Sequence, residues 1–143
     1  MLEILYEDNH IIVVNKPQNI PTQSDSSGDK DMFTIVKEYI IEKYKKPGDA
    51  YVGLVHRLDR PTGGILVFAK TSKAAARLSE QVRNKELKKE YLVVADGKFK
   101  KPTGHLENYL LKNERKNISK VVEEGTKNSK LASLDYEVIK THS

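Results

Sequence analysis

One segment of the chain combines several chemically active side chains. It runs from His56 to Gly64 and reads His-Arg-Leu-Asp-Arg-Pro-Thr-Gly-Gly. If the backbone is extended there, Arg57 and Asp59 lie on one face and His56 and Leu58 on the other. A carboxylate at a strand end, beside arginines and a glycine turn, is held in a fixed position. On these residues alone, a surface salt bridge next to a turn is the first explanation to consider.

Several other kinds of site do not fit this segment. No Gly-Lys-Ser or Gly-Lys-Thr follows the glycines at the spacing that a phosphate-binding loop needs. His56 and Asp59 alone are too few for a metal site, and the other three histidines are scattered along the chain. The chain has no cysteine, which excludes a disulfide scaffold, a thiolate zinc site and a cysteine nucleophile. We therefore expect no metal.

The elements that must position this segment are predicted from apolar periodicity. The pattern is that of an α+β domain with a mixed or antiparallel sheet and two flanking helices. Asp31 is the expected cap of the first helix. Residues 114–130 are polar and predict a loop or a weak hairpin. The expected helices cover residues 32–44 and 72–84, and the expected strands cover 4–6, 11–15, 52–58, 65–69, 90–95 and 131–139.

The length and charge of the chain indicate how many domains it forms and what kind of partner it suits. The 143 residues fit one domain, without a linker that divides two cores. The longest apolar run is residues 11–14, too short to cross a membrane, and the acidic N-terminus is unlike a signal peptide. Residues 70–101 carry ten basic and four acidic side chains, more than the whole net charge of +5. Such a zone suits a polyanion such as RNA, although a solvated helix face is the commoner explanation.

Three motifs in register resemble the RluA family of pseudouridine synthases. The segment from His56 to Gly64 is similar to the family signature HRLD-x-x-[ST]-[SG]-G. Residues 13–17, Val-Val-Asn-Lys-Pro, look like its V-x-K-P element, and residues 89–93, Lys-Glu-Tyr-Leu-Val, look like its K-x-Y strand. The resemblance implies a cytoplasmic isomerase that converts specific uridines of ribosomal or transfer RNA to pseudouridine. It also implies a monomer with no membrane association and no cofactor, because the reaction neither oxidises nor hydrolyses its substrate.

The resemblance also assigns roles to individual residues. Asp59 matches the catalytic aspartate that acts at the ribose C1′, and Tyr91 matches an active-site tyrosine. The positions that match RNA-contacting or supporting residues are Arg57, Arg60, Lys16 and Lys89. Structural positions at the site are His56, Thr62, Gly63 and Gly64. Whether the aspartate forms a covalent intermediate or acts through a glycal is left open. Gly63 stands where many members carry serine, and glycine preserves the turn.

One element of the family is missing from the sequence. The family continues with a pattern like R-x-H-Q-I-R, whose arginine pairs with the catalytic aspartate, and nothing of that pattern occurs before Ser143. Residues 1–143 therefore resemble the first two-thirds or so of a single catalytic domain, incomplete at its C-terminus, with no separate N-terminal RNA-binding domain. We expect this 143-residue chain to be inactive. The alternatives are a non-catalytic RNA-binding module of the same fold, and a nucleoside or glycoside hydrolase that uses Asp59.

Overall fold

The computed structural model describes residues 1–142 and divides the chain into two compact units. The first unit is Met1–Tyr91, and the second begins at Leu92. The elements of the first unit are β1 (Glu3–Glu7), β2 (Ile11–Lys16), α1 (Met32–Tyr44), β3 (Gly53–Leu54), β4 (Gly64–Ala69) and α2 (Ser72–Arg83). The elements of the second are β5 (Thr103–Asn113), β6 (Ile118–Val122) and β7 (Lys130–Glu137).

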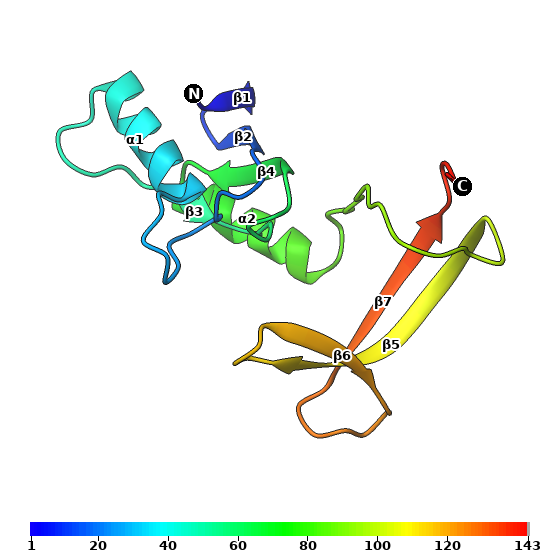
Figure 1. Cartoon of the computed structure of the whole chain (residues 1–143). Helices are drawn as coiled ribbons and strands as arrows, with labels where there is room; N and C mark the ends of the chain where they lie inside the picture. Colours follow the sequence, from blue (N-terminus) through cyan, green and yellow to red (C-terminus); the bar gives the residue numbers. More distant parts are fainter. Residues whose placement is uncertain (143) are drawn as a thin grey trace. The chain divides into compact units, whose positions relative to one another are not determined.

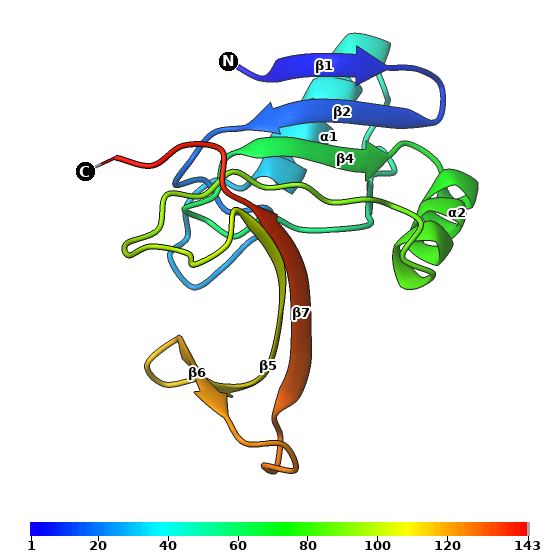
Figure 2. The ribbon, with the colours of Figure 1, turned by 90° about the vertical axis from the view of Figure 1, so that its right-hand side faces the viewer.

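The first unit is an antiparallel sheet covered by α1. Its strand order is β1-β2-β4-β3, and every neighbouring pair is antiparallel (Figures 1 and 2). Alternate residues of β2 are buried, as the period of two in a half-buried strand requires. The buried core residues of β2, β4 and α1 are Ile12, Val14, Leu66, Phe68, Met32, Val36 and Ile40.

Both predicted helices are present, and the cap expected for the first helix is confirmed. The Asp31 carboxylate accepts a hydrogen bond of 2.8 Å from the Thr34 amide, so it satisfies a free donor of the first turn of α1. Thr71 caps α2 in the same way through the Ala74 amide. At β3, a side chain on Gly53 would lie 2.8 Å from the Ala75 methyl, so glycine allows α2 to approach this strand closely.

The second unit is a three-stranded antiparallel sheet with the order β6-β5-β7. The expected strand at residues 131–139 is β7, and the hairpin suggested for 114–130 contains β6. The sequence analysis did not predict β5, the longest strand. Several apolar side chains of this sheet remain exposed, including Ile118, Val121, Leu131 and Leu134. The α+β class with antiparallel pairing is confirmed, with two sheets in place of one.

The strand predicted at residues 90–95 is wrong. This segment is irregular, and its apolar side chains Leu92, Val93 and Val94 are exposed by 83% or more. An uninterrupted apolar run is typical of a strand that is buried on both faces, and such a strand needs neighbours to hydrogen bond with. The run pairs with no strand of residues 1–142. The boundary between the two units, at Tyr91, falls inside it.

A buried carboxylate ties β1 to α1 and to the end of β4. Glu7 accepts hydrogen bonds of 2.7–2.8 Å from Tyr39, Lys43, Tyr44 and Lys70. Burial by itself would raise the pKa of Glu7, but these four donors outweigh it and lower the pKa to about 2. The Lys70 ammonium is largely buried here and also bonds the Asp8 carbonyl at 2.7 Å. Lys70 therefore does not belong to an exposed RNA-binding zone, contrary to the sequence interpretation.

We expect Glu7→Gln to destabilise the first unit by about 2 kcal/mol at pH 7, because a neutral amide loses the charge-assisted hydrogen bonds. The native pKa lies below that of the unfolded chain, so the stabilisation is present above pH 4.5 and disappears as the pH falls toward 2. Urea unfolding at a series of pH values measures this, with the exposed Glu42→Gln as control. An equally steep acid dependence in wild type and Glu7→Gln would contradict the assignment.

Candidate active site

Asp59 lies on the wall of a small hollow in the first unit. The hollow has a volume of about 220 Å³ and is formed by two segments that are far apart in sequence. Its lining residues are Pro21, Thr22, Gln23, Ser24, Asp25, Arg57, Leu58, Asp59 and Arg60. Exposure alternates as expected from the sequence, with Arg57 and Asp59 exposed and Leu58 buried between them. Within residues 1–142 the Asp59 carboxylate has no hydrogen-bond or ion-pair partner, so it is available to a substrate.

The backbone around Asp59 is fixed by a threonine hydroxyl. Thr22 is buried, and its Oγ1 donates to the Leu58 carbonyl at 2.6 Å and accepts from the Leu58 amide at 3.1 Å. One hydroxyl thus satisfies both polar groups of the residue before Asp59. On the other side, the Thr62 amide donates to the Asp59 carbonyl at 2.9 Å and closes a turn. The chain is therefore held on both sides of the carboxylate.

Lys16 is buried beneath this turn and does not face solvent. Its ammonium donates to the carbonyls of Ile20 at 2.6 Å, Arg60 at 3.1 Å and Pro17 at 3.2 Å. Burial lowers the pKa of Lys16 and the Arg60 charge lowers it further, whereas the charge of nearby Asp59 raises it. All three N–H donors are occupied, so of the two roles expected for Lys16, RNA contact or support of the site, the geometry favours support. Lys16 supports the Asp59 turn.

His56 completes the sheet where β3 ends. The half-buried imidazole accepts a hydrogen bond of 2.9 Å from the Val67 amide of β4 through Nε2. The side chain therefore replaces a backbone carbonyl as the strand leaves the ladder. Burial lowers the pKa of His56, and the positive charge of Lys89 lowers it further. The neutral ring that this hydrogen bond needs is thus favoured, and Lys89 lies close enough to the segment to influence it.

The glycines let the chain turn beneath Asp59. Gly64 has φ +137°, a conformation that residues with a side chain rarely adopt. A Cβ at Gly63 would lie 3.2 Å from the Lys16 carbonyl oxygen, which is tighter than most such contacts. The two glycines therefore allow β4 to begin against the end of β2, as the sequence analysis expected from the turn residues.

Arg60 is occupied by two carboxylates. Its guanidinium lies 2.7 Å from Asp25 and 2.7 Å from Asp29, and it also donates to the Ser27 hydroxyl at 2.6 Å. These ion pairs hold the loop between β2 and α1 at the rim of the hollow. The sequence analysis expects Arg60 to contact RNA, but in this structure its guanidinium is already paired with two carboxylates.

Tyr91 and Lys89 are not among the described residues that line the hollow of Asp59. Tyr91 is 60% exposed at the end of the first unit. Lys89 is exposed in the same irregular segment. Of the predicted set, the hollow contains Arg57, Asp59 and Arg60.

No group of three or more potential metal ligands occurs within residues 1–142. No helix of the described chain is long and apolar enough to cross a membrane.

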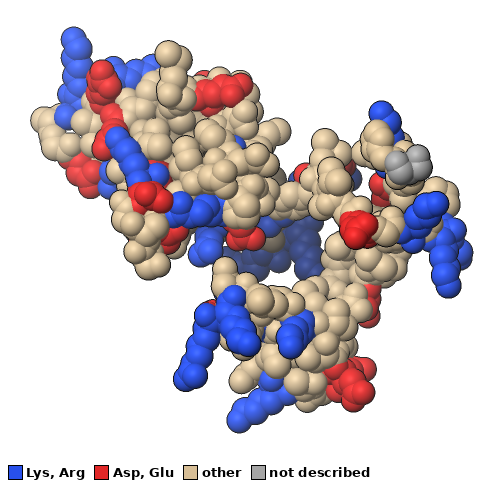
Figure 3. All heavy atoms as spheres, in the orientation of Figure 1, with Lys and Arg blue, Asp and Glu red and all other residues tan. Residues whose placement is uncertain are grey.

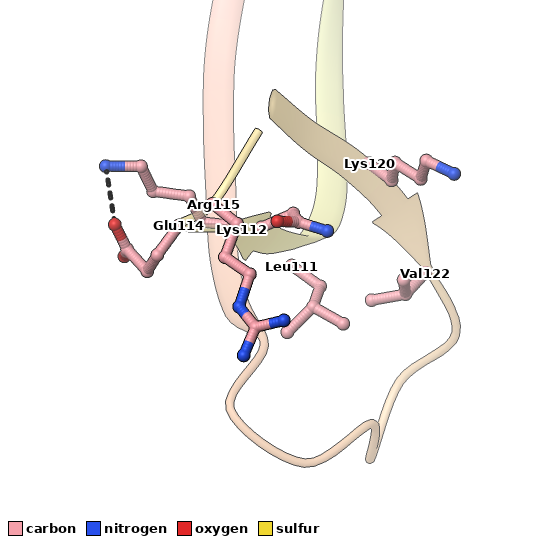
Figure 4. A pocket seen from close by; sticks show the side chains of 7 residues that line it. Leu111, Lys112, Glu114, Arg115, Lys120 and Val122 are labelled. Atoms are coloured by element: carbon pink, nitrogen blue, oxygen red, sulfur yellow. Dashed lines mark ion pairs between the residues drawn. The ribbon is translucent and has the colours of Figure 1, made fainter. Parts of the chain in front are cut away.

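A larger hollow lies in the second unit. It has a volume of about 460 Å³ at the end of the β5–β6 hairpin, where Leu111 and Val122 line it and Arg115 extends beside Leu111 (Figure 4). Lys112 and Glu114 form an ion pair of 3.3 Å at its edge. Basic side chains project into solvent around this hairpin (Figure 3). The hollow contains no predicted catalytic residue, so size alone does not identify the site.

Thr22 is the residue supporting the Asp59 segment that sequence reasoning missed. We expect Thr22→Val to lower the free energy of unfolding of the first unit by about 2 kcal/mol, because the Leu58 amide and carbonyl lose their partner. Thr22→Ser keeps the hydroxyl and is the matched control. Urea unfolding followed by the helical circular dichroism signal measures the difference, since both helices lie in the first unit. Equal stabilities of the valine and serine variants would show that Thr22 does not hold the Asp59 segment.

Comparisons with known proteins agree with the sequence motifs. The chain matches the family described as RNA pseudouridylate synthase over residues 10–143. It is 36% identical to ribosomal large subunit pseudouridine synthase C of Buchnera aphidicola (subsp. Acyrthosiphon pisum, strain APS) over 121 residues, which are 83% of this chain and 36% of that protein. It is 38% identical to the uncharacterized RNA pseudouridine synthase YhcT of Bacillus subtilis (strain 168) over 104 residues, which are 72% of this chain and 33% of that protein.

A solved structure has the same fold. Human RNA pseudouridylate synthase domain containing 4 superposes with a TM-score of 0.69 at 16% identity, covering 98% of this chain and 54% of that chain. The chain spans about a third of the length of the curated relatives that it matches, 36% and 33% in the two cases above. The family match over residues 10–143 contains all three motifs of the sequence analysis, and the chain therefore belongs to the RNA pseudouridylate synthase family.

Proposed function

We propose that the protein to which this chain belongs isomerises uridine to pseudouridine in RNA, with Asp59 as the catalytic residue. The observation that supports this most is the Asp59 carboxylate, which is unpaired within residues 1–142, exposed in a hollow and held by a rigid backbone. Family membership supplies the reaction. Several relatives are named ribosomal large subunit pseudouridine synthases, which favours ribosomal RNA as the substrate, with transfer RNA as the alternative.

The reaction needs little from the protein beyond a positioned carboxylate. The bond between uracil N1 and ribose C1′ breaks, and a carboxylate can attack C1′ or stabilise the cationic sugar that results. Uracil then rotates, and a bond forms between its C5 and C1′. The hydrogen on C5 is lost to solvent and N1 gains a proton, so the product is an isomer of the substrate. No oxidant, reductant or water is consumed.

The neighbouring groups have supporting roles in this proposal. The target base must leave its stack to reach Asp59, and the exposed Arg57 beside it can hold the phosphate or brace the gap. Tyr91 serves as the base-stacking residue and Lys89 as a phosphate contact. Lys16, His56, Thr62, Gly63 and Gly64 shape the turn. We place the enzyme in the cytoplasm, acting as a monomer without a cofactor.

Mapping pseudouridines in cellular RNA tests the proposal. Ribosomal and transfer RNA from cells with the intact gene, without it, and with a gene carrying Asp59→Ala are compared site by site. We expect specific pseudouridines to be absent from the last two. If the deletion removes no pseudouridine, the isomerase proposal is wrong. If the deletion removes sites that Asp59→Ala retains, the protein takes part but Asp59 is not the catalytic residue.

A further inference from the structure

The loop that faces Arg60 carries two negative charges at the rim of the proposed active site. Residues 24–29, here called the strap, connect β2 to α1 and read Ser-Asp-Ser-Ser-Gly-Asp. Within the strap, the Asp25 carboxylate accepts a hydrogen bond of 2.9 Å from the Ser27 amide, and the Ser27 hydroxyl accepts one of 3.1 Å from the Asp29 amide. Gly28 adopts φ +76° to close this turn. The strap is therefore an ordered turn that presents Asp25 and Asp29 together.

The side chains of the strap contact the Asp59 segment through the Arg60 guanidinium. Arg60 donates through Nη2 to Asp25 and through Nη1 to Asp29, both at 2.7 Å. Hydrogen bonds lower the pKa of Asp25 to about 2, and the one from the Ser27 hydroxyl contributes most, followed by the one from Arg60. A hydrogen bond from Arg60 is also the largest cause of the lowered pKa of Asp29. Both carboxylates are therefore charged at neutral pH. The Arg60 side chain is 33% exposed, so its pairs are accessible to solvent.

A guanidinium recognises phosphate with the same forked geometry that it uses for carboxylates. Arg60 immediately follows Asp59, and both line the hollow together with Asp25. A phosphate next to a uridine in the hollow would thus meet the two aspartates at the guanidinium. Solvent-exposed ion pairs are weak and can exchange. In contrast, the Lys16 ammonium is fully buried and already bonded to three carbonyls, so it is not open to a ligand in this way.

We propose that the strap is an internal competitor of RNA. Asp25 and Asp29 hold Arg60 in the free protein, and an RNA phosphate replaces them when the target nucleotide enters the hollow. The exchange favours uridines inside a polynucleotide over free uridine, because a nucleoside without phosphates has nothing with which to displace the strap. This inference rests on the proposed function, since it requires the ligand of the hollow to be RNA.

The salt dependence of RNA binding tests this exchange. Fluorescence anisotropy with a labelled single-stranded oligouridylate gives the dissociation constant of the full chain at several salt concentrations. In wild type, the affinity gained from the new contact between Arg60 and phosphate is offset by the loss of the Arg60 ion pairs with Asp25 and Asp29. In the Asp25→Asn, Asp29→Asn double variant Arg60 is free, so we expect affinity about tenfold higher at low salt. The slope of log K against log salt should steepen by about 0.7, the value for one phosphate contact on a single strand.

Two further variants make the result specific to Arg60. The Asp49→Asn, Asp96→Asn double variant removes the same charge from two exposed positions outside the strap and should give a smaller gain. Adding Arg60→Gln to the strap variant should abolish the gain. The single change Asp29→Asn leaves the hydrogen bond between Asp25 and Ser27 intact, so it controls for loss of the strap conformation in the double variant. It should give part of the gain in affinity. Affinity unchanged or lowered in the strap variants, or a gain that survives Arg60→Gln, would overturn the inference.

The inference and the proposed function can fail separately. If Asp59-dependent pseudouridine formation is found but the strap variants bind RNA as wild type does, only the exchange at Arg60 is wrong. If the strap variants show the expected steeper salt slope but the gene makes no pseudouridine, the site binds RNA and the isomerase proposal is wrong. If wild type and strap variants all fail to bind the oligouridylate, the exchange is wrong irrespective of the activity.

Discussion

Replacing Asp59 with asparagine in the protein encoded by the intact gene is expected to lower the rate of pseudouridine formation at least about a thousandfold. An amide of nearly the same shape can neither attack C1′ nor stabilise a cationic sugar. Folding should be unaffected, because the Asp59 carboxylate has no partner within residues 1–142 and is exposed. The rate is measured with purified protein and ribosomal RNA that lacks the modification.

The matched control is Asp96→Asn, which neutralises an exposed aspartate in a turn of the irregular segment outside the hollow. It should retain the wild-type rate. RNA binding by Asp59→Asn should also be retained, since the change removes a negative charge beside the ligand. A rate within tenfold of wild type would show that Asp59 does not carry the reaction.

Replacing Lys16 with methionine is expected to lower the free energy of unfolding of the first unit by about 4 kcal/mol. The side chain is fully buried, and methionine fills much of its volume but leaves the carbonyls of Pro17, Ile20 and Arg60 without this donor. Each such acceptor costs about 1–3 kcal/mol, partly relieved by local rearrangement. Urea unfolding at pH 7, followed by the helical circular dichroism signal, gives the value.

Lys37→Met is the control, because the Lys37 ammonium on α1 bonds no backbone carbonyl and instead pairs with the exposed Asp49 and lies 5.5 Å from the Phe33 ring. It should change stability by less than about 1 kcal/mol. If Lys16 instead acts by contacting RNA, Lys16→Met would unfold like Lys37→Met and would weaken RNA binding without loss of structure. That outcome would contradict the role that the geometry assigns to Lys16.

Local patterns predicted the elements whose formation depends on their own residues. The helix of residues 32–44 was predicted because its apolar spacing and its Asp31 cap are both local, and both are confirmed. The strands β1, β2 and β4 alternate or end at turns that the sequence displays. The strand expected at residues 90–95 was wrong because a strand depends on a partner elsewhere in the chain, and a local apolar pattern does not reveal whether that partner is there.

In the candidate site, too, local features were predicted and long-range contacts were not. The motif located Asp59 and its turn, but the supports of that turn come from distant positions. Thr22 lies 36 residues from Leu58 in sequence, and an isolated threonine in a loop gives no sign of such a contact. A lysine at the end of a strand usually lies at the surface, so its spacing did not indicate that Lys16 is buried. The pairing of Arg60 with the strap likewise depends on a loop that folds back 31–35 residues away.

The fate of the C5 hydrogen of uridine tests the central claim most directly. RNA transcribed with uridine tritiated at C5 is incubated with the protein from the intact gene, and tritium in water and free uracil are measured separately. The account predicts that tritium appears in water, that no free uracil forms, and that both the wild-type protein and Asp96→Asn do this while Asp59→Asn does not. Release of free tritiated uracil would indicate a hydrolase, and release of neither product by the wild-type protein would indicate an RNA-binding module without catalysis. Either result would contradict the isomerase assignment.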